Sequence, residues 1–426
     1  MVVLHQALVV LTLLLCKGLA FEKVFDTNIP GHMEPLGSHA HPSQVETRWT
    51  VPTPEEFYRL YTSASKPVVL KGAATRFPAY RLWTDSYLRN YGNWKVVVEE
   101  GKKEDRSKPT YTMSMNEFLD TYKARDVYLV HDLVPPNPMT EEVLLPKPIT
   151  CGGFQHNIQS VVLWFSSGGT ESTFHAEQVD NLECMFDGWK EYLLISKKDG
   201  ETILDEDEGK YQEMDVEKVD MTIFPEIAQL PWYKLHVEPG DCFFVPQGWL
   251  HFVNSSKTRN MAISFWLTHQ YRVVDDCHRP DQRKEVLSQI TISDAGESSR
   301  VAFLDLFFGK PNMTLPVFLK FFSTEEAKQE ETENMQANQS RESLMQRWME
   351  IHKSKNSLKT FQQIDKNGDN LLSVDEVYNA PLVFFEKLIG GLGEEYAKYE
   401  TVGDDEGKSG EDILKERKRM FLRNEL

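Results

Sequence analysis

The chain has little positive charge beside its acidic residues, few cysteines, and no long uncharged apolar run beyond its first twenty residues. Its 426 residues carry 47 Lys and Arg against 65 Asp and Glu, which gives a formal net charge of −18. Because no segment forms a basic face that could hold phosphates, we do not expect nucleic acid as a partner. No later segment is long and apolar enough for the ~30 Å hydrocarbon core of a bilayer, so no membrane span is expected.

Cysteine is scarce, and its placement limits the disulfides that can form. Of the five cysteines, Cys16 lies within the first twenty residues. The other four could form two disulfides in an oxidising compartment, with three possible pairings. Cys184 and Cys242 lie in apolar runs and fit equally well as small buried residues. Cys151 and Cys277 flank the central part of the chain and are the bridge that we expect.

Both ends of the sequence predict the secretory pathway. Residues 1–20, MVVLHQALVVLTLLLCKGLA, hold a short apolar stretch followed by small residues, which is typical of a signal peptide although no Lys or Arg precedes the stretch. The last four residues, 423–426, read Arg-Asn-Glu-Leu and are similar to the Lys-Asp-Glu-Leu retrieval signal. We therefore expect the lumen of the endoplasmic reticulum. Three glycosylation sequons agree with this route, at Asn254, Asn312 and Asn338.

The central part of the chain contains two histidines and a carboxylate in a pattern that suits a metal. His175 and Glu177 are two residues apart, so a strand would point both side chains to one face. His251 follows 74 residues later, at the end of an apolar run that a second strand could form. Two imidazoles and one carboxylate are the protein ligands of a non-haem iron(II) site. A surface polar pair is the alternative, but the glycine turn and apolar runs around these residues favour a metal at the mouth of a barrel.

The surroundings of these residues resemble the JmjC family of iron and 2-oxoglutarate dependent oxygenases. The resemblance covers residues 45–270 and rests on segments such as LWFSSGGTESTFHAE, DGWKEYLLI and HVEPGDCFFVPQGWLHFV. It implies a mainly β fold with some α, a double-stranded β-helix (cupin or jelly-roll) barrel with flanking helices. It also implies roles for six residues: iron(II) ligation by His175, Glu177 and His251, and contact with 2-oxoglutarate by Lys190, Ser172 and Asn181.

Lys190 also has a physical argument of its own. It lies in the apolar run GWKEYLLI, where a buried lysine is costly unless an anion accompanies it. The distal carboxylate of 2-oxoglutarate would be such an anion, whereas a lysine that points to solvent would be an ordinary strand-edge charge. Glu177 occupies a position where many hydroxylases of the family have Asp, which keeps metal binding but leaves the reaction subtype open.

The remaining segments divide the chain further. Residues 21–44 are expected to lead into the barrel, residues 271–323 to form a helical extension that could pair two copies, and residues 324–349 to form an acidic linker. Residues 350–420 resemble an all-α EF-hand region, because DKNGDNLLSVDE has the calcium-loop spacing. The expected calcium ligands are Asp365, Asn367, Asp369, Leu371 through its carbonyl, Ser373 and Glu376. The segment 405–416 is expected to be a degenerate partner loop that binds calcium weakly or not at all.

Two functions are compatible with this sequence. The resemblance implies an iron(II) and 2-oxoglutarate dependent dioxygenase that uses dioxygen to hydroxylate a side chain of a secretory-pathway protein. Methyl-lysine demethylation uses the same cofactors, but a chromatin substrate conflicts with a signal peptide. The alternative is a catalytically retired lumenal protein that binds calcium and partners. The retention of all three iron ligands and of Lys190 favours the enzyme.

Overall fold

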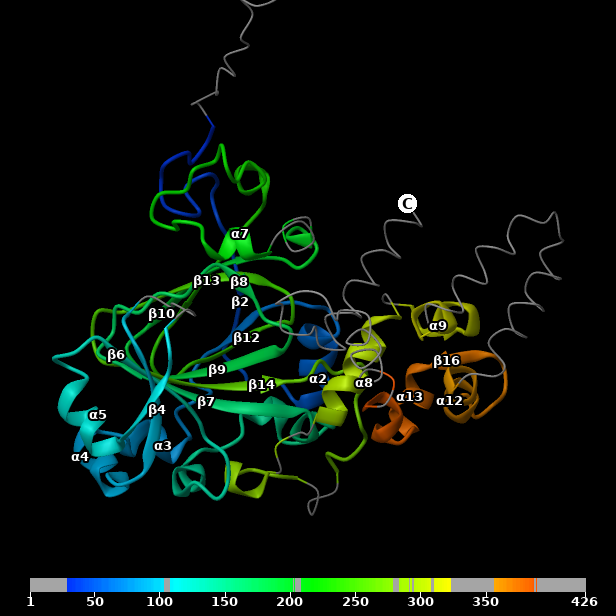
Figure 1. Ribbon diagram of the computed structural model, residues 1–426. Coiled ribbons are helices and arrows are strands. Elements are labelled where there is room, and N and C mark those ends of the chain that lie inside the picture. Colours follow the sequence, from blue (N-terminus) through cyan, green and yellow to red (C-terminus); the bar gives the residue numbers. More distant parts are fainter. Residues whose placement is uncertain are drawn as a thin grey trace, which may run out of the picture.

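The structure, a computed structural model, describes residues 29–102, 108–201, 203, 208–278, 283–290, 292, 295–307, 310–322, 356–386 and 388. Several of the expectations above fall outside these residues: the signal peptide, the linker 324–349, the sequon at Asn338, the segment 405–416 and the tail 423–426. Within the described residues, two β-sheets face each other with helices around them, and a small helical unit lies beside them (Figure 1).

The larger sheet has nine strands and runs through the middle of the molecule. Neighbouring strands pair antiparallel, except for the parallel pair at one edge formed by β2 and β3. In spatial order the strands are β2 (Glu46–Arg48), β3 (Val68–Leu70), β12 (Cys242–Val245), β9 (Asp180–Asp187), β14 (Asn260–Leu267), β7 (Ile158–Ser166), β6 (Val127–Asp132), β4 (Lys95–Glu100) and β5 (Tyr111–Ser114).

The smaller sheet has five strands and supplies most of the candidate site. Its order is β1 (Ser43–Gln44), β11 (Tyr233–Val237), β10 (Lys190–Ile195), β13 (Leu250–Ser255) and β8 (His175–Ala176). Only β1 and β11 pair parallel. Two facing sheets of mainly antiparallel strands confirm the expected mainly β, jelly-roll type of architecture.

The alternation of side chains along β10 separates the interior of the barrel from its outside. Tyr192 and Leu194 pack between the two sheets, whereas Leu193 and Ile195 pack outside, against residues between 203 and 230. Lys190 has the same parity as Tyr192 and therefore lies on the interior face. This period of two decides which polar residues enter the pocket.

Helices and short turns lie around both sheets (Figure 1). Around the barrel they are α2 (Pro54–Phe57), the π-helical turn η1 (Tyr58–Thr62), α3 (Pro78–Leu82), α4 (Asp85–Leu88), α5 (Met115–Thr121), α7 (Glu208–Gln212) and the 3-10 turns Arg89–Tyr91, Pro138–Glu142, Lys147–Ile149, Phe154–His156, Ile227–Gln229 and Leu287–Gln289. Thr53 and Ser114 begin α2 and α5 with capping boxes. Buried aromatic pairs such as Phe118 and Phe165, whose ring centroids lie 5.1 Å apart, join helices to the sheet.

A helical unit with its own apolar core follows the barrel. It consists of α8 (Ala295–Asp305), β15 (Asn312–Thr314), α9 (Leu315–Phe322), α12 (Asn356–Ile364), β16 (Leu371–Ser373) and α13 (Val374–Asn379). Its core includes Phe303, Phe318 and Phe361, all fully buried. Strand β16, in the expected calcium loop, pairs antiparallel with β15, and Met313 faces Leu372. Among the described residues, the strand that pairs with this loop is therefore 312–314, a pairing that the sequence pattern did not predict.

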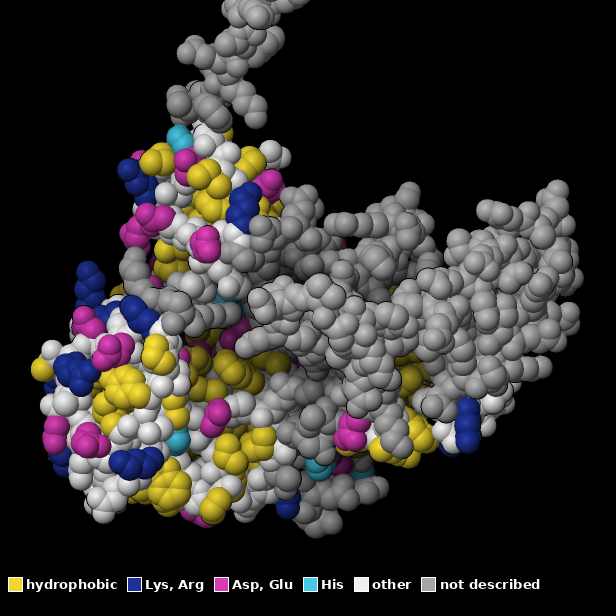
Figure 2. All heavy atoms as spheres, viewed as in Figure 1, with side chains coloured by type: hydrophobic (Ala, Val, Ile, Leu, Met, Phe, Trp, Pro, Cys, Tyr) yellow, Lys and Arg dark blue, Asp and Glu magenta, His cyan; other side chains and the backbone are white. Residues whose placement is uncertain are grey.

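Among the described residues on the face drawn in Figure 2, basic side chains do not form one continuous area. Over α4 and α5, basic and acidic side chains alternate with apolar ones (Figure 2). Among the described residues, no helix combines the length and the apolar character needed to cross a membrane.

Candidate active site

Two neighbouring strand ends of the smaller sheet bring His175, Glu177 and His251 together. His175 begins β8, and its partner across the antiparallel pair with β13 is His251. The two imidazole rings lie 4.4 Å apart between centroids. One ligand atom from each of the three side chains lies within 4.8 Å of the other two. The structure thus gathers the three residues that the sequence predicted as metal ligands.

Backbone carbonyl groups orient both imidazoles in the same way. Nδ1 of His175 lies 2.9 Å from the carbonyl oxygen of Thr173, and Nδ1 of His251 lies 2.9 Å from that of Trp249. A carbonyl oxygen can only accept, so each Nδ1 carries the proton and donates. The lone pair of each ring is then on Nε2, which is the tautomer that a metal ligand requires.

The turn before β13 holds the segment that carries Glu177. The amide of Gly248 donates to the carbonyl oxygen of Glu177 at 2.8 Å. The side-chain amide of Gln247 donates to the backbone carbonyl oxygen of Gln178 at 3.1 Å. Gly248 has a φ of 76°, which is unfavourable for any residue with a side chain. A Cβ at this position would also lie 2.8 Å from Cδ of Lys197. The sharp turn therefore fixes Glu177 beside the two histidines.

The three residues open onto a cavity between the two sheets. The cavity has a volume of about 170 Å³. Besides the triad, its walls are formed by Glu99, Tyr128, Trp164, Thr170, Glu171, Ser172, Asn181, Glu183, Lys190, Tyr192, Val253 and Trp266. All three residues expected to contact 2-oxoglutarate are in this set.

Lys190 points into the cavity and not to solvent. It is only 4% exposed, and its Nζ donates to Oε1 of Glu183 at 2.6 Å. Nζ also lies 5.5 Å from the ring centroid of Trp164, close enough for a cation–π interaction. The alternative of an ordinary strand-edge charge is therefore wrong.

Glu183 was not predicted from the sequence, although it is central to the pocket. Its Oε2 accepts hydrogen bonds from the hydroxyls of Tyr192 and Ser264, each at 3.0 Å. Burial raises the pKa of Tyr192 well above its ordinary value, and the negative Glu183 raises it further, so the phenol remains a donor. The signal was available, because Glu183 interrupts the apolar run NLECMF two residues after Asn181, on the same face of the strand.

Ser172 and Asn181 differ in how many hydrogen bonds their side chains already form within the protein. The hydroxyl of Ser172 accepts from the amide of Val253 at 2.9 Å and donates to the carbonyl oxygen of Thr173 at 2.8 Å. By contrast, the buried Oδ1 of Asn181 has no hydrogen-bond partner among the described residues. An unsatisfied buried acceptor at a cavity wall indicates a place for a ligand or a water. Asn181 therefore fits its expected role better than Ser172 does.

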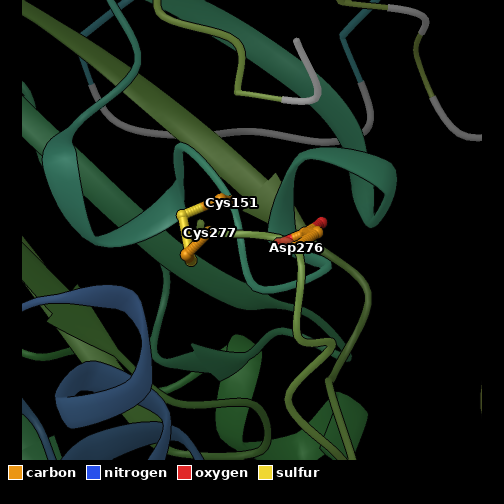
Figure 3. Close-up of side chains that lie close together, drawn as sticks. All are labelled: Cys151, Asp276 and Cys277. Carbon is orange, nitrogen blue, oxygen red and sulfur yellow. A yellow bond between two sulfur atoms is a disulfide. The ribbon is translucent and has the colours of Figure 1, made fainter. Parts of the chain in front are cut away.

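A second group of metal-binding residue types lies away from the cavity. Cys151 and Cys277 form a disulfide with a sulfur–sulfur distance of 2.12 Å, and Asp276 lies beside them (Figure 3). Metals bind thiolates, and these two sulfurs are bonded to each other. Asp276 accepts from the amide of Gly152 and the side chain of Gln155. This group is a structural crosslink, and it confirms the expected bridge.

The other two cysteines of this region are also bonded. Cys184 on β9 and Cys242 on β12 are direct cross-strand partners and form a disulfide. The sequence left open whether these two cysteines form a disulfide or are small buried residues. They form a disulfide, and both are also fully buried.

The expected calcium loop is closed by its own side chains. Oδ1 and Oδ2 of Asp365 accept from the amides of Gly368 and Asn370 at 2.8 and 3.0 Å. Glu376 reaches back across the loop, accepting from the amides of Lys366 and Ser373, each at 3.0 Å. Burial raises the pKa of Glu376, but the hydrogen bonds that it accepts more than offset this, and the net pKa is lowered.

The calcium loop also needs one unusual backbone conformation. Asn370 has a φ of 61°, in the left-handed region where the sequence pattern usually has glycine. Asn367 and Asp369 accept from amides inside the loop, so both side chains face its interior. Five of the expected ligands, Asp365, Asn367, Asp369, Ser373 and Glu376, thus accept hydrogen bonds from amides of this loop, but the three carboxylates do not converge as closely as the three residues of the cavity do.

Relatives with similar sequences carry JmjC names. Lysine-specific demethylase 8 of Xenopus tropicalis is 26% identical over 226 residues, which cover 50% of this chain and 51% of the relative. Jumonji C domain-containing protein 5 of Drosophila melanogaster is 25% identical over 232 residues, or 50% of this chain and 58% of the relative. The human bifunctional peptidase and (3S)-lysyl hydroxylase JMJD7 is 22% identical over 262 residues, covering 52% and 83%.

The family match lies on the barrel. This chain spans about half the length of the first two of these relatives. The family described as "Cupin-like domain" matches residues 54–273, just over half of the chain and the part that contains the triad and Lys190. The chain therefore belongs to the Cupin-like domain family, and its barrel is a cupin-like JmjC domain.

Proposed function

We propose that this protein is an iron(II) and 2-oxoglutarate dependent oxygenase that hydroxylates a side chain of a protein substrate. The observation that carries the proposal is the convergence of two imidazoles and one carboxylate at the wall of a cavity that also contains a buried lysine. The names of the relatives include demethylases and a lysyl hydroxylase, and both reactions belong to this class.

The residues present fit these cofactors. Two neutral imidazoles and one carboxylate cover one side of an octahedral ion and leave positions for a co-substrate and dioxygen. The unsatisfied Oδ1 of Asn181 offers an acceptor at the cavity wall. When bound, iron(II) and 2-oxoglutarate supply the chemistry that places one atom of dioxygen into a C–H bond while 2-oxoglutarate becomes succinate and carbon dioxide.

The chain's own residues bind and orient. His175, Glu177 and His251 would hold the metal, and the carbonyl groups behind both imidazoles keep Nε2 directed at it. Lys190 is a buried cation in the cavity wall, where it is paired with Glu183. Val253 and Trp266 in the cavity walls would exclude water from the bound co-substrate.

We place the substrate in the endoplasmic reticulum lumen. The two disulfides support this proposal, because disulfides persist in oxidising compartments and are rare in the cytosol and nucleus. A lumenal enzyme has no access to chromatin, and a secretory-pathway protein is then the natural substrate. Hydroxylation is accordingly favoured over demethylation.

We further propose that the loop from Asp365 to Glu376 binds one calcium ion. Three observations support this: the ligand spacing, the left-handed Asn370, and the pairing of β16 with β15, which resembles the pairing of two EF-hand loops. The loop containing β15 runs from about residue 306 to residue 317 and has no Asp or Glu. It would support its neighbour without binding an ion itself.

Metal and co-substrate binding test the proposed oxygenase. Iron(II) should be titrated into the full chain without oxygen, and 2-oxoglutarate then added while the metal-to-ligand charge-transfer band is recorded. We expect one band per chain in the wild type and none in His175→Ala or His251→Ala. His236→Ala is the matched control, because His236 lies on β11 with a 40% exposed side chain, outside the cavity.

The same titration separates the proposal from its alternative. A retired barrel would give no band in the wild type, whereas an active one gives a band and also forms succinate in air. A wild-type band that survives His251→Ala would show that other residues bind the iron.

A further inference from the structure

The carboxylate of Glu183 is built into the part of the cavity where a co-substrate carboxylate is expected. Glu183 lies on β9, is only 2% exposed, and forms part of the cavity wall together with Lys190. Asn181 and Glu183 have the same parity on this strand, so both point into the barrel. Glu183 is therefore a pocket residue and not a surface charge.

Three hydroxyl or ammonium groups hold the Glu183 carboxylate in place. Lys190 donates to Oε1 at 2.6 Å, and Tyr192 and Ser264 donate to Oε2 at 3.0 Å each. Ser264 in turn accepts from the indole of Trp164 at 2.9 Å. The three donors to Glu183 come from two strands, β10 and β14, and Trp164 on β7 supports one of them. A carboxylate with this many fixed donors keeps its position when a ligand enters.

The consequence is that the charge of Lys190 is already balanced by the protein. The Lys190 and Glu183 side chains are 5% and 3% exposed, so water screens neither charge effectively. A ligand carboxylate that approached Lys190 would also approach Glu183, and two like charges at short range in a buried site repel strongly. The pocket around Lys190 therefore stabilises the distal carboxylate of a dicarboxylate much less than a lysine without Glu183 beside it would.

We propose that Glu183 is the residue that sets the co-substrate preference of this site, by holding Lys190 and weakening the pocket's preference for a 2-oxo dicarboxylate over a 2-oxo monocarboxylate. This inference rests on the proposed function, because it concerns the co-substrate of the same metal site. It assigns Glu183 a role in specificity and leaves metal binding to the triad.

A pair of ligands with equal chain length tests the inference. 2-Oxoglutarate and 2-oxopentanoate differ only in the distal carboxylate, which is a methyl group in the second. Binding to the full chain loaded with manganese(II), which avoids turnover, can be measured by calorimetry. For the wild type we expect the two dissociation constants to lie within about tenfold of each other.

Removing the Glu183 charge should then change the affinity for one of the two ligands only. In Glu183→Gln we expect 2-oxoglutarate to bind at least about tenfold more tightly, with 2-oxopentanoate changed less than about threefold. Glu183→Leu removes the charge without adding an amide donor and should act in the same direction. Glu191→Gln is the matched control, because Glu191 is next to Lys190 on β10 but points outward to Lys234 and is 37% exposed.

Each outcome supports or overturns the inference. It is overturned if the wild type prefers 2-oxoglutarate by more than about a hundredfold, a result that needs no variant. It is also overturned if neither folded Glu183 variant tightens 2-oxoglutarate. Failure of the proposed function looks different: the manganese-loaded wild type would then bind neither 2-oxo acid, and His175→Ala would behave like the wild type.

Discussion

At the scale of residues, the pocket contains an ion pair whose value for stability is small but whose disruption is costly. Taking two charges out of water carries a desolvation penalty that their attraction barely repays. The pair of Lys190 and Glu183 is satisfied on both sides, with Tyr192 and Ser264 completing the carboxylate. Loss of one partner leaves the other charge buried alone. The pair is therefore recognised by a difference in the free energy of unfolding between single and double variants.

Lys190→Met should destabilise the protein by about 3–5 kcal/mol, because it leaves Glu183 buried without a cation. The double variant Glu183→Gln, Lys190→Met should recover most of this loss, since the remaining groups are neutral. Chemical denaturation of the full chain measures both free energies of unfolding. Lys234→Met, in the partly exposed pair with Glu191, should cost at most about 1 kcal/mol. Equal losses in the single and double variants would contradict a charge-paired Lys190.

His269 gives the stability of the barrel a pH dependence. Burial lowers the pKa of His269, but the negative charge of Asp180 and the 2.8 Å hydrogen bond to it outweigh burial, so the pKa is raised above its ordinary 6.5. A raised pKa means that the folded state binds the proton more tightly. This contribution is complete below pH 6.5 and is lost as the pH rises through the raised value.

Comparison with His269→Gln isolates this contribution. The melting temperature of the wild type should exceed that of the variant at pH 6, and the gap should shrink by about 2–4 °C for each kcal/mol lost on going to pH 9. Wild-type data alone are insufficient, because burial lowers the pKa of His131 and works in the opposite direction. A gap that is constant or grows with pH would show that the pair with Asp180 is not ionic.

At the scale of elements, the sequence predicted the triad because its geometry is local. His175 and Glu177 are two residues apart, and His251 ends an apolar strand beside a turn, so few arrangements could satisfy both patterns. Lys190 was predicted from the family resemblance, and its position inside an apolar run agreed with that role. Glu183 had the same signal but was not recognised, because a carboxylate in a strand is explained only by its partners. Those partners, Tyr192 and Ser264, come from other strands. The sequence of one strand does not show which other strands lie beside it.

The pairing of β15 with β16 was beyond sequence reasoning for a related physical reason. The loop around Met313 has no acidic ligands, so nothing in it resembles a calcium site. Its position is set by tertiary packing, in which Phe303 and Phe318 share a core with Phe361 of α12. The ligand spacing predicted the calcium loop, and only the shared core identified the strand that pairs with it.

One calcium ion per chain is expected, and Glu376→Gln should remove most of the affinity. Glu376 is the only residue placed to bind calcium through both carboxylate oxygens, and the other five ligands cannot complete six to eight contacts. With three charged ligands, the dissociation constant should be roughly 10⁻⁴–10⁻³ M. Calorimetry on the full chain measures this. Asp375→Asn is the control, since Asp375 pairs with Arg272 and is 75% exposed. Two equivalent sites would mean that another loop also binds.

At the scale of the whole molecule, the barrel and the helical unit are connected through the segment that follows β14. The amide of Tyr271 donates to the hydroxyl of Tyr378 at 3.2 Å, and Arg272 pairs with Asp375 at 2.7 Å. A few residues further on, Cys277 is bonded to Cys151. The disulfide therefore anchors the connecting segment to the barrel on one side (Figure 3), while α13 anchors it on the other.

The two disulfides should contribute unequally to the stability of this assembly. Cys151–Cys277 closes a sequence separation of 126 residues and Cys184–Cys242 one of 58, and loop-closure entropy gives upper values of about 5 and 4 kcal/mol. Paired Cys→Ala variants, compared by chemical denaturation, measure both losses. We expect the Cys151 pair to cost at least as much and also to loosen residues 271–278, which hydrogen exchange would detect.

Thiol titration of the protein from an oxidising compartment tests the same crosslinks without any variant. We expect no reactive thiol at these four cysteines in the unfolded, unreduced chain and four after reduction. Protein made in a reducing cytosol should lack both bonds and unfold at lower denaturant concentration, because its unfolded chain is no longer constrained. Four thiols in chains isolated from the lumen would contradict both crosslinks. They would also remove the support that the crosslinks give to a lumenal oxygenase, although the triad would still be open to the iron titration.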